Sequence, residues 1–112
     1  MNRYIVLFFL TFICLINVSA QADRQFVRSG NKLYRMQEYS KAEAEYRKSI
    51  AVNPDNPQAL YNLGCALMMQ QKDSAAVEEY QKAARVEKNS LRKAKIFHNI
   101  GVICQNRKMF GE

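Results

Sequence analysis

Two glycines, Gly30 and Gly64, lie 34 residues apart, and each stands in the middle of a segment with helical periodicity. At this spacing the chain aligns with itself, because small and aromatic residues of the first copy recur in the second. The matched pairs are Phe26 with Leu60, Gly30 with Gly64, Leu33 with Leu67, Ala42 with Ala76, Tyr46 with Tyr80, and Ser49 with Ala83. Such a period predicts an all-α chain in which similar helical units stack on one another.

A 34-residue period with small residues at helix crossings and an aromatic residue between them resembles the tetratricopeptide repeat (TPR). The resemblance implies helical hairpins stacked as a right-handed solenoid of about two and a half repeats. It divides the chain into repeats at 23–56 and 57–90 and a partial third repeat at 91–112, which contains helix A alone. A stack of this kind presents a binding surface rather than a catalytic pocket, so we expect no enzymatic activity.

Signals for helix ends fit this division. In the first repeat we expect helix A over residues 23–35 and helix B over residues 41–52. Ser40 and Glu43 have the spacing of a capping box, in which each side chain satisfies a backbone N–H at the start of helix B. Asn56-Pro57 predicts an N-cap followed by proline at the first helical position of the next repeat.

The third copy departs from the period. Gly64 and Gly101 lie 37 residues apart, which places about one extra helical turn near residues 88–94. Asn89-Ser90 has the composition of a helix cap, so we expect the last helix to begin early, at Ser90. Because no helix B follows it, the last helix is expected to expose part of its apolar side chains, as in the front part of a longer protein. These are Ile96, Phe97, Ile100 and Ile103. Two and a half repeats alone should melt broadly or self-associate.

Residues 1–20 have the composition of a secretory signal. Arg3 precedes the apolar run Ile5–Ile16, and the small residues Val18-Ser19-Ala20 predict cleavage before Gln21. The run is shorter than the ~20 residues of a membrane span, which favours a cleaved signal over an anchor. We therefore expect export, with a periplasmic location.

The remaining chain is basic, but its charge does not favour a nucleic-acid partner. Without Arg3, it has 16 Lys and Arg and 10 Asp and Glu, a net charge of +6. The cations are scattered along amphipathic helices, as on an ordinary solvated surface, and no nucleic-acid motif accompanies them. Nothing in the sequence predicts a small-molecule substrate or a cofactor.

Cysteine and histidine offer little chemistry. Cys65 and Cys104 remain after cleavage, and their spacing does not suggest a disulfide scaffold, so we interpret them as free thiols. One histidine, His98, and two dispersed cysteines make a poor metal site, so neither a metal nor catalysis is predicted. A Cys65–His98 pair would resemble a nucleophile and its base, but no orienting group accompanies it.

The A helices of such repeats line the concave face of the stack. Counting from the glycines assigns the following residues to that face: Arg24, Val27, Asn31, Tyr34, Gln58, Tyr61, Cys65, Met68, Lys95, His98, Val102 and Gln105. The residues proposed to bind a partner are Asn31, Tyr34, Tyr61, Asn62, Cys65, Met68, Lys95 and His98. An apolar, polarisable centre suits an extended peptide or a partner helix. Asn31, Asn62 and Lys95 also match part of the lysine–asparagine clamp by which some TPR domains hold a carboxylate. Val27 and Asn99 stand where that clamp has a lysine and an arginine, so we do not expect a working clamp.

Three stretches carry a more specific resemblance: residues 28–31, 59–67 and 98–102, behind a signal that ends Ser19-Ala20-Gln21. They resemble the exported TPR proteins of the Bacteroides aerotolerance (Bat) system, of the BatC type. This resemblance implies a periplasmic scaffold that assembles membrane-anchored von Willebrand A-type Bat proteins and is associated with oxygen or stress tolerance. A chaperone-like peptide adaptor and a thiol-based redox protein remain as alternatives.

Overall fold

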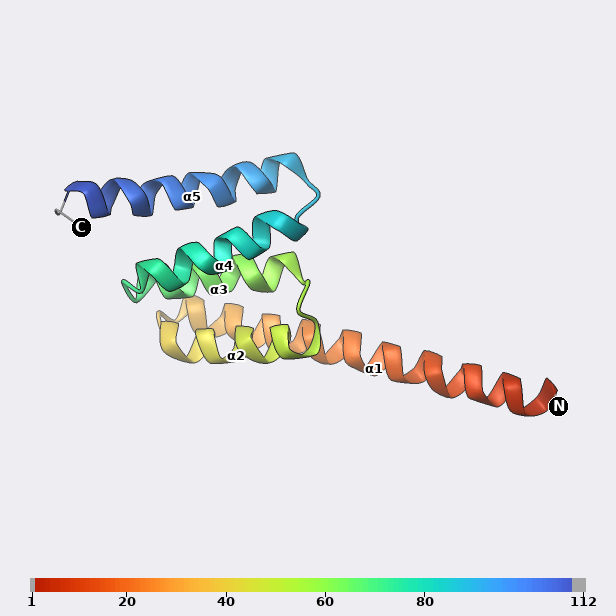
Figure 1. Cartoon of the computed structure of the whole chain (residues 1–112). Helices are drawn as coiled ribbons and strands as arrows, with labels where there is room; N and C mark the ends of the chain where they lie inside the picture. The colour runs from red at the N-terminus through yellow and green to blue at the C-terminus, as the bar shows by residue number, and fades with distance from the viewer. Residues whose placement is uncertain (1, 110–112) are drawn as a thin grey trace.

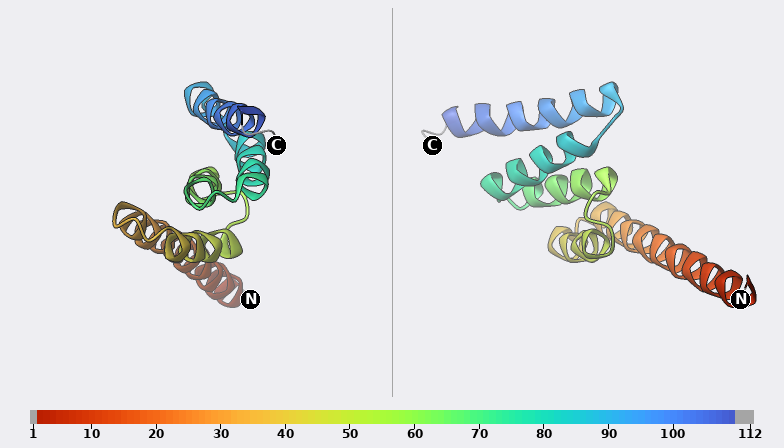
Figure 2. Two further views of the ribbon diagram at one scale, coloured as in Figure 1. Left: turned by 90° about the vertical axis from the view of Figure 1, so that its left-hand side faces the viewer. Right: turned by 45° about the vertical axis from the view of Figure 1, so that its right-hand side comes forward.

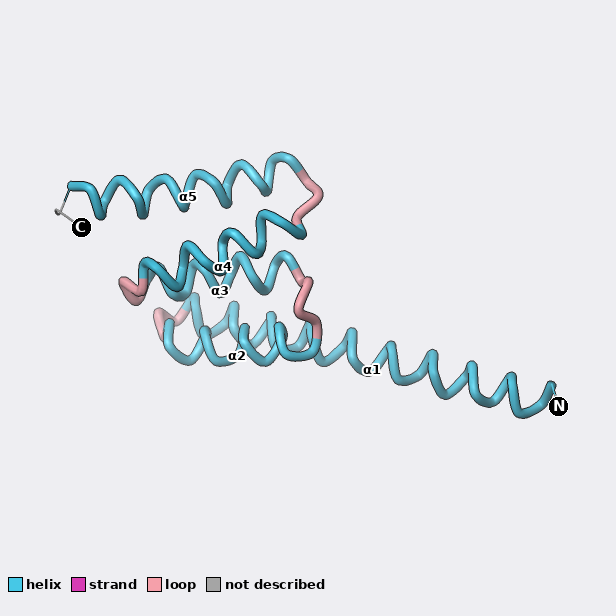
Figure 3. The backbone as a smooth tube through the Cα atoms, viewed as in Figure 1, coloured by secondary structure: helices cyan, strands magenta, loops and turns pink. Residues whose placement is uncertain are grey.

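The computed structural model describes residues 2–109, and all of its regular elements are helices. They form antiparallel hairpins that stack along one direction, with the A–B turns at one end and the loops between repeats at the other (Figures 1 and 3). The helices are α1 (Asn2–Arg35), α2 (Tyr39–Val52), α3 (Pro57–Met69), α4 (Asp73–Val86) and α5 (Ser90–Met109). The predicted all-α stack of helical hairpins is confirmed.

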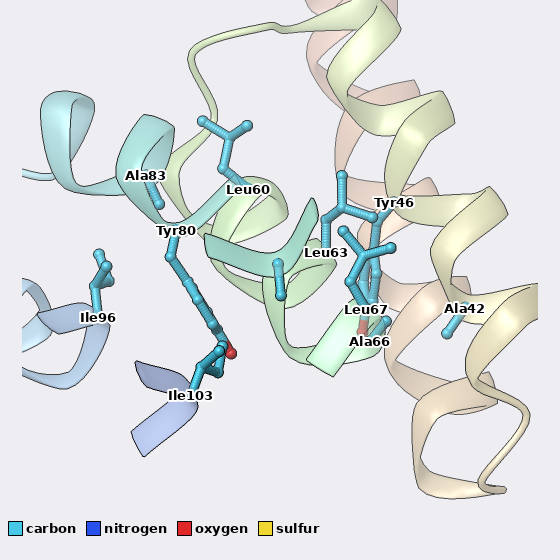
Figure 4. Packing of buried hydrophobic residues seen from close by; sticks show 11 residues of the cluster. Ala42, Tyr46, Leu60, Leu63, Ala66, Leu67, Tyr80, Ala83, Ile96 and Ile103 are labelled. Atoms are coloured by element: carbon cyan, nitrogen blue, oxygen red, sulfur yellow. The ribbon is translucent and has the colours of Figure 1, made fainter. Parts of the chain in front are cut away.

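Both glycines that define the period lie where a tyrosine ring crosses the helix. A Cβ atom added at Gly64 would lie 2.6 Å from Cδ1 of Tyr80, and one added at Gly30 would lie 2.7 Å from Cδ1 of Tyr46. Figure 4 shows both tyrosines among the aliphatic residues of the core. The predicted close crossing is confirmed, and it explains why glycine is retained despite costing about 1 kcal/mol against alanine within a helix.

The turns between helices A and B close without the predicted capping box. α2 begins at Tyr39, so Ser40 lies inside its first turn, and the N-cap residue Glu38 makes no side-chain cap. The turn is instead held by backbone bonds from Glu38 N–H to Leu33 O and from Gln37 N–H to Tyr34 O, both 2.9 Å. This is a Schellman motif with Gln37 at positive φ. The capping-box prediction was wrong because it placed the start of helix B two residues late.

The caps predicted between repeats are confirmed. The Asn56 side chain accepts hydrogen bonds from the N–H groups of Gln58 (3.0 Å) and Ala59 (3.2 Å), and proline occupies the first position of α3. Asn89 accepts from Arg92 N–H at 3.0 Å, and α5 begins at Ser90 as the extended spacing predicts. These caps satisfy N–H groups that have no partner inside the helix.

The last helix is better covered than expected. Ile96 and Ile103 are 1% and 2% exposed, because α5 packs its apolar stripe against α4. The expectation of partial exposure was therefore wrong for these two isoleucines, but it was right for Phe97 and for Ile100, which is half-buried. Phe97, on another face, is 58% exposed, and a Cβ atom added at Gly101 would meet nothing within 4 Å.

The first helix continues far beyond the repeat. α1 runs unbroken from Asn2, whereas helix A of the repeat was expected to begin near Asp23, and its first half projects from the stack (Figures 1 and 2). All residues from Asn2 to Ser19 are exposed. Within the described chain, α1 alone is long and apolar enough to cross a membrane, with a mean hydropathy of 2.2 over its most apolar window. A signal sequence has the same properties.

Candidate functional site

Two adjoining cavities open on the side of the stack formed by α1, α3 and α5. The aromatic cavity, about 200 Å³, is lined by Asn31, Tyr34, Tyr46, Tyr61, Asn62 and Cys65. The loop-end pocket, about 500 Å³, is lined by Asn56, Pro57, Gln58, Tyr61, Asn62, Glu87, Arg92, Lys95 and Ile96. Tyr61 and Asn62 line both, so the two cavities adjoin along α3, and we call them together the groove.

Most of the residues predicted to bind a partner lie in this groove. Five of them line the aromatic cavity, and Lys95 lines the loop-end pocket. Met68 is half-buried beside Tyr80, and His98 is exposed on α5. Neither residue lines the aromatic cavity or the loop-end pocket. Val27, which was assigned to the concave face, is only 5% exposed and belongs to the core. A helical count identifies a face of α1 but not how far α2 covers it.

A hydrogen-bonded triad joins the first repeat to the second. The Asn31 side-chain oxygen accepts from the Tyr46 hydroxyl at 2.7 Å and from the Asn62 amide at 3.0 Å. The three side chains come from α1, α2 and α3, so the bonds fix the position of the second repeat on the first. We call the contact of α3 with the first repeat the first junction.

An equivalent arrangement joins the second repeat to α5. The Tyr80 hydroxyl donates to the Cys65 sulfur at 3.2 Å, and the Asn99 amide donates to the hydroxyl oxygens of Tyr80 (3.3 Å) and Tyr61 (3.2 Å). We call this contact the second junction. Asn99 occupies the position of Asn62, two residues before the glycine. Sequence analysis missed its role, and the shared Asn-x-Gly spacing was the signal that could have identified it.

Burial sets the protonation of the aromatic cavity. Desolvation raises the pKa of the Cys65 thiol, and it likewise raises the pKa of Tyr34 and of Tyr61. Tyr46 and Tyr80 have their pKa values raised further by the same cause. The hydroxyl groups therefore stay neutral hydrogen-bond donors, and Cys65 stays a thiol. Because the thiolate is the reactive form, this environment disfavours redox or nucleophilic chemistry at Cys65.

The loop-end pocket is the charged part of the groove. Glu87 is 7% exposed; its carboxylate accepts from the Asn89 backbone N–H at 3.1 Å and lies 3.2 Å from Nε of Arg92. The backbone hydrogen bond, followed by the contact with Arg92, lowers the pKa of Glu87. Lys95 is exposed and forms no ion pair with any other residue in 2–109. The pocket thus has two cations against one paired carboxylate.

The residues of the suggested carboxylate clamp do not converge. Asn31 lines only the aromatic cavity, Lys95 lines only the loop-end pocket, and the Asn62 amide already donates to Asn31. A clamp needs its ammonium and amide donors directed at one anion. Asn31 and Asn62 bind each other across the junction of the two repeats and do not point at a common anion. No three His, Cys, Asp or Glu side chains of residues 2–109 gather in a way that could hold a metal ion.

Comparison with known proteins places these helices in a family. A model described as "TPR repeat" matches residues 30–71, and one described as "Tetratricopeptide repeat" matches residues 57–90. Together they span residues 30–90, more than half of the chain. No curated protein matches.

A solved structure has the same fold. It is that of YrrB, described as a TPR protein with an unusual peptide-binding site, and it superposes with a TM-score of 0.66 at 19% sequence identity. The match covers 74% of this chain and 41% of YrrB, so the chain spans less than half of that protein. The glycine–tyrosine crossings, the family matches and the shared fold lead to one conclusion: the chain is a tetratricopeptide repeat protein.

Proposed function

We propose that the groove along α3 binds an extended segment of a partner protein and that the chain acts as a non-enzymatic adaptor. The observation that carries this proposal is that the aromatic cavity and the loop-end pocket adjoin at Tyr61 and Asn62. An extended peptide can place one side chain in each cavity while its backbone follows the groove. The peptide-binding site named for YrrB supports the proposal by analogy of fold.

The two ends of the groove suit different side chains. Tyr34 and Tyr61 offer half-buried rings with neutral hydroxyl groups, a surface on which apolar or aromatic side chains pack well. Lys95 and Arg92 make the other end positive. The expected ligand therefore has an apolar residue at one end and an acidic residue at the other.

Replacement of Tyr61 tests the groove, because this side chain borders both cavities. Fluorescence polarisation against an array of peptides that pair apolar with acidic residues should detect binding by the wild type. Tyr61→Ala should weaken binding by roughly tenfold or more, the range of an aromatic hot spot. Phe97→Ala is the matched control, because Phe97 is exposed and lines neither cavity. Equal binding by the wild type and Tyr61→Ala would reject the groove.

We further propose that the partner belongs to a Bat-type complex. The support is the resemblance of residues 28–31, 59–67 and 98–102 to BatC-type proteins, together with an exposed apolar segment that fits an export signal. The chain would then assemble membrane-anchored von Willebrand A-type proteins at the periplasmic side of the inner membrane. Purified Bat proteins should bind the wild type and lose affinity for Tyr61→Ala. Peptide binding without binding of these proteins would favour the chaperone-like adaptor.

Export is proposed from the N-terminal segment, with cleavage before Gln21. The apolar residues of this segment are exposed, and a large exposed apolar surface normally contacts a membrane or a partner. An alkaline phosphatase fusion after Glu112 should be active in a bacterial host, because that enzyme folds only outside the cytoplasm. Arg insertion into Ile5–Ile16 should abolish this activity. An inactive fusion of the unmodified chain would contradict export.

A further inference from the structure

None of the other helices that the structure describes covers the side of α5 around Gly101. In each of the first two repeats, a tyrosine of helix B lies over the glycine of helix A: Tyr46 over Gly30, and Tyr80 over Gly64. Gly101 has the corresponding place in α5, but a Cβ atom added there would meet nothing within 4 Å. α5 forms one end of the stack, and this side of it faces away from the other helices (Figure 1).

The side chains next to Gly101 share this exposure. Phe97 lies one turn before it and is 58% exposed, whereas Leu60, at the same position of α3, is 2% exposed. Cys104 lies one turn after it and is exposed, whereas its counterpart Leu67 is 1% exposed. We call Phe97, Gly101 and Cys104 the open face of α5. Its counterpart on α3 is an interface between two helices, so the open face is built for the same kind of contact.

The helices α2 and α4 show which side chains fill such a face. Each has an alanine, a tyrosine four residues later and a small residue three residues after the tyrosine, and all of these side chains are fully or almost fully buried. They are Ala42, Tyr46 and Ser49 in α2, and Ala76, Tyr80 and Ala83 in α4. The small residues permit a close approach of the two helices, and the ring fills the space above the glycine.

The charge of α5 restricts the occupant further. Between Ser90 and Met109 the sequence has five Lys or Arg residues and no Asp or Glu. Lys108, one turn beyond Cys104, is exposed and forms no ion pair with any other residue of 2–109. A basic helix attracts an acidic one and repels another basic one. Two copies of α5 would bring like charges together, so a second copy of the chain does not suit this face.

We propose that the open face of α5 docks an acidic amphipathic helix of a partner protein, in which small residues flank an aromatic residue. The partner helix takes the place of a third helix B. Its aromatic ring lies over Gly101 as Tyr80 lies over Gly64, and its carboxylates lie near Lys108. The site is separate from the groove, because no residue of the open face lines the aromatic cavity or the loop-end pocket. It depends neither on peptide binding in the groove nor on export.

A peptide based on α4 is the probe that tests this proposal. It consists of residues 73–86 with Lys82→Glu, a fluorescein label and a hydrocarbon staple that replaces Gln81 and Arg85. Both stapled positions are exposed in α4, and the staple is needed because a helix of this length is marginal in water. Fluorescence polarisation with the full chain should show saturable binding. Tyr80→Ala in the probe should weaken binding by roughly tenfold or more, as loss of an aromatic anchor does.

Gly101→Leu in the protein is the decisive variant. The new side chain occupies the place of the aromatic ring, and leucine is a better helix former than glycine, so the variant should fold at least as well as the wild type. It should weaken probe binding by roughly tenfold or more. Asn106→Leu is the matched control, because it adds the same side chain at an exposed position about 140° around α5. The control should bind the probe as the wild type does.

Alkylation of cysteine locates the bound probe. Saturating probe should slow the reaction of Cys104 with iodoacetamide several-fold and leave that of Cys65 unchanged, because only Cys104 belongs to the open face. Probe binding that protects Cys65 and not Cys104 would assign the probe to the groove and overturn the proposal. Equal binding by the wild type and Gly101→Leu would overturn it too, as would no saturable binding up to about 1 mM.

Two other occupants of the open face remain to be distinguished from a partner helix. Analytical ultracentrifugation should show that the chain does not dimerise through this face. A dimer that Gly101→Leu dissociates would give the face to a second copy and overturn the proposal. Alkylation of Cys104 in the chain alone should be as fast as that of an unstructured cysteine peptide. Slow alkylation would show that the chain covers its own open face, which also contradicts docking of a partner.

Discussion

At the first junction, the Asn62 amide donates to an amide oxygen, that of Asn31, which also accepts from Tyr46. At the second junction, the equivalent Asn99 donates to two hydroxyl oxygens, and Tyr80 donates to the sulfur of Cys65. α3 packs on both helices of the first repeat, whereas α5 packs mainly on α4. The three extra residues before Gly101 thus accompany a looser junction, and the loop-end pocket lies between α3 and α5.

The two junctions differ in how their polar side chains are used. Some bind the repeats to each other, and others remain available to a partner. Tight contact at the first junction uses the polar groups of Asn31 and Asn62 within the protein. At the second junction Lys95 and Gln58 line the loop-end pocket. Lys95 forms no salt bridge with any other residue of the described chain. The longer spacing before Gly101 thus accompanies the larger and more charged of the two cavities, whereas the first junction borders the smaller, aromatic one.

The largest predicted effect concerns the glycines. Gly64→Ala should lower the free energy of unfolding by about 1–3 kcal/mol, because the new Cβ atom collides with the Tyr80 ring. Gly101→Ala should instead raise it by about 0.5–1 kcal/mol, since the site is open and alanine is the better helix former. Urea unfolding followed by circular dichroism measures both. Destabilisation by Gly101→Ala would contradict the open site at Gly101, and stabilisation by Gly64→Ala would contradict the close crossing at Gly64.

Removal of single hydroxyl groups compares the junctions more finely. Tyr46→Phe should cost about 1 kcal/mol, because the Asn31 oxygen loses its shorter hydrogen bond. Tyr80→Phe should cost less, because the acceptor of its hydroxyl is sulfur, a weak one. The Asn99 amide also loses the Tyr80 oxygen at 3.3 Å, but it keeps the Tyr61 oxygen at 3.2 Å. The variants keep the ring that fills the glycine crossing, so thermal unfolding reports the hydroxyl alone. A larger loss for Tyr80→Phe would contradict the view that the second junction is the looser one.

The smallest predicted difference concerns the reactivity of the Cys65 thiol, which lies at the second junction. Cys65 should react with iodoacetamide more slowly than the exposed Cys104 at neutral pH, because burial raises the pKa of the Cys65 thiol and lowers its thiolate fraction. Its rate should keep rising with pH above about 8.5, where an ordinary thiol is already half ionised. Mass spectrometry of the two alkylated peptides gives both rates. Faster reaction at Cys65 would revive the thiol-based redox alternative.

Local signals predicted much of the architecture. The glycine–tyrosine crossings, the cap at Asn56 and the early start of α5 all follow from residue types at short range. The A–B turns did not, because Gln37 and Gln71 adopt the positive φ that glycine or asparagine normally supplies. Nothing in a glutamine signals that conformation. It follows from the two Schellman hydrogen bonds and the packing of the hairpin.

The sequence predicted which helices and which residues line the candidate site, but it did not predict the hydrogen bonds between those residues. Counting from the glycines brought Asn31, Tyr61 and Cys65 to one face, and they do line one cavity. The three residues that match part of a carboxylate clamp, Asn31, Asn62 and Lys95, are distributed over two cavities. An asparagine amide is available to a ligand only if no side chain of a neighbouring helix lies within hydrogen-bond distance of it. The helical period of the sequence does not predict that distance.

By itself, the sequence determined that this protein is a stack of helical hairpins, because the period, the small residues at crossings and the caps act over a few residues or one repeat. The tertiary structure decided which polar atoms of the concave side are used between repeats and where the groove widens. Those outcomes depend on how closely α1, α3 and α5 approach one another, and the packing of all five helices sets that approach.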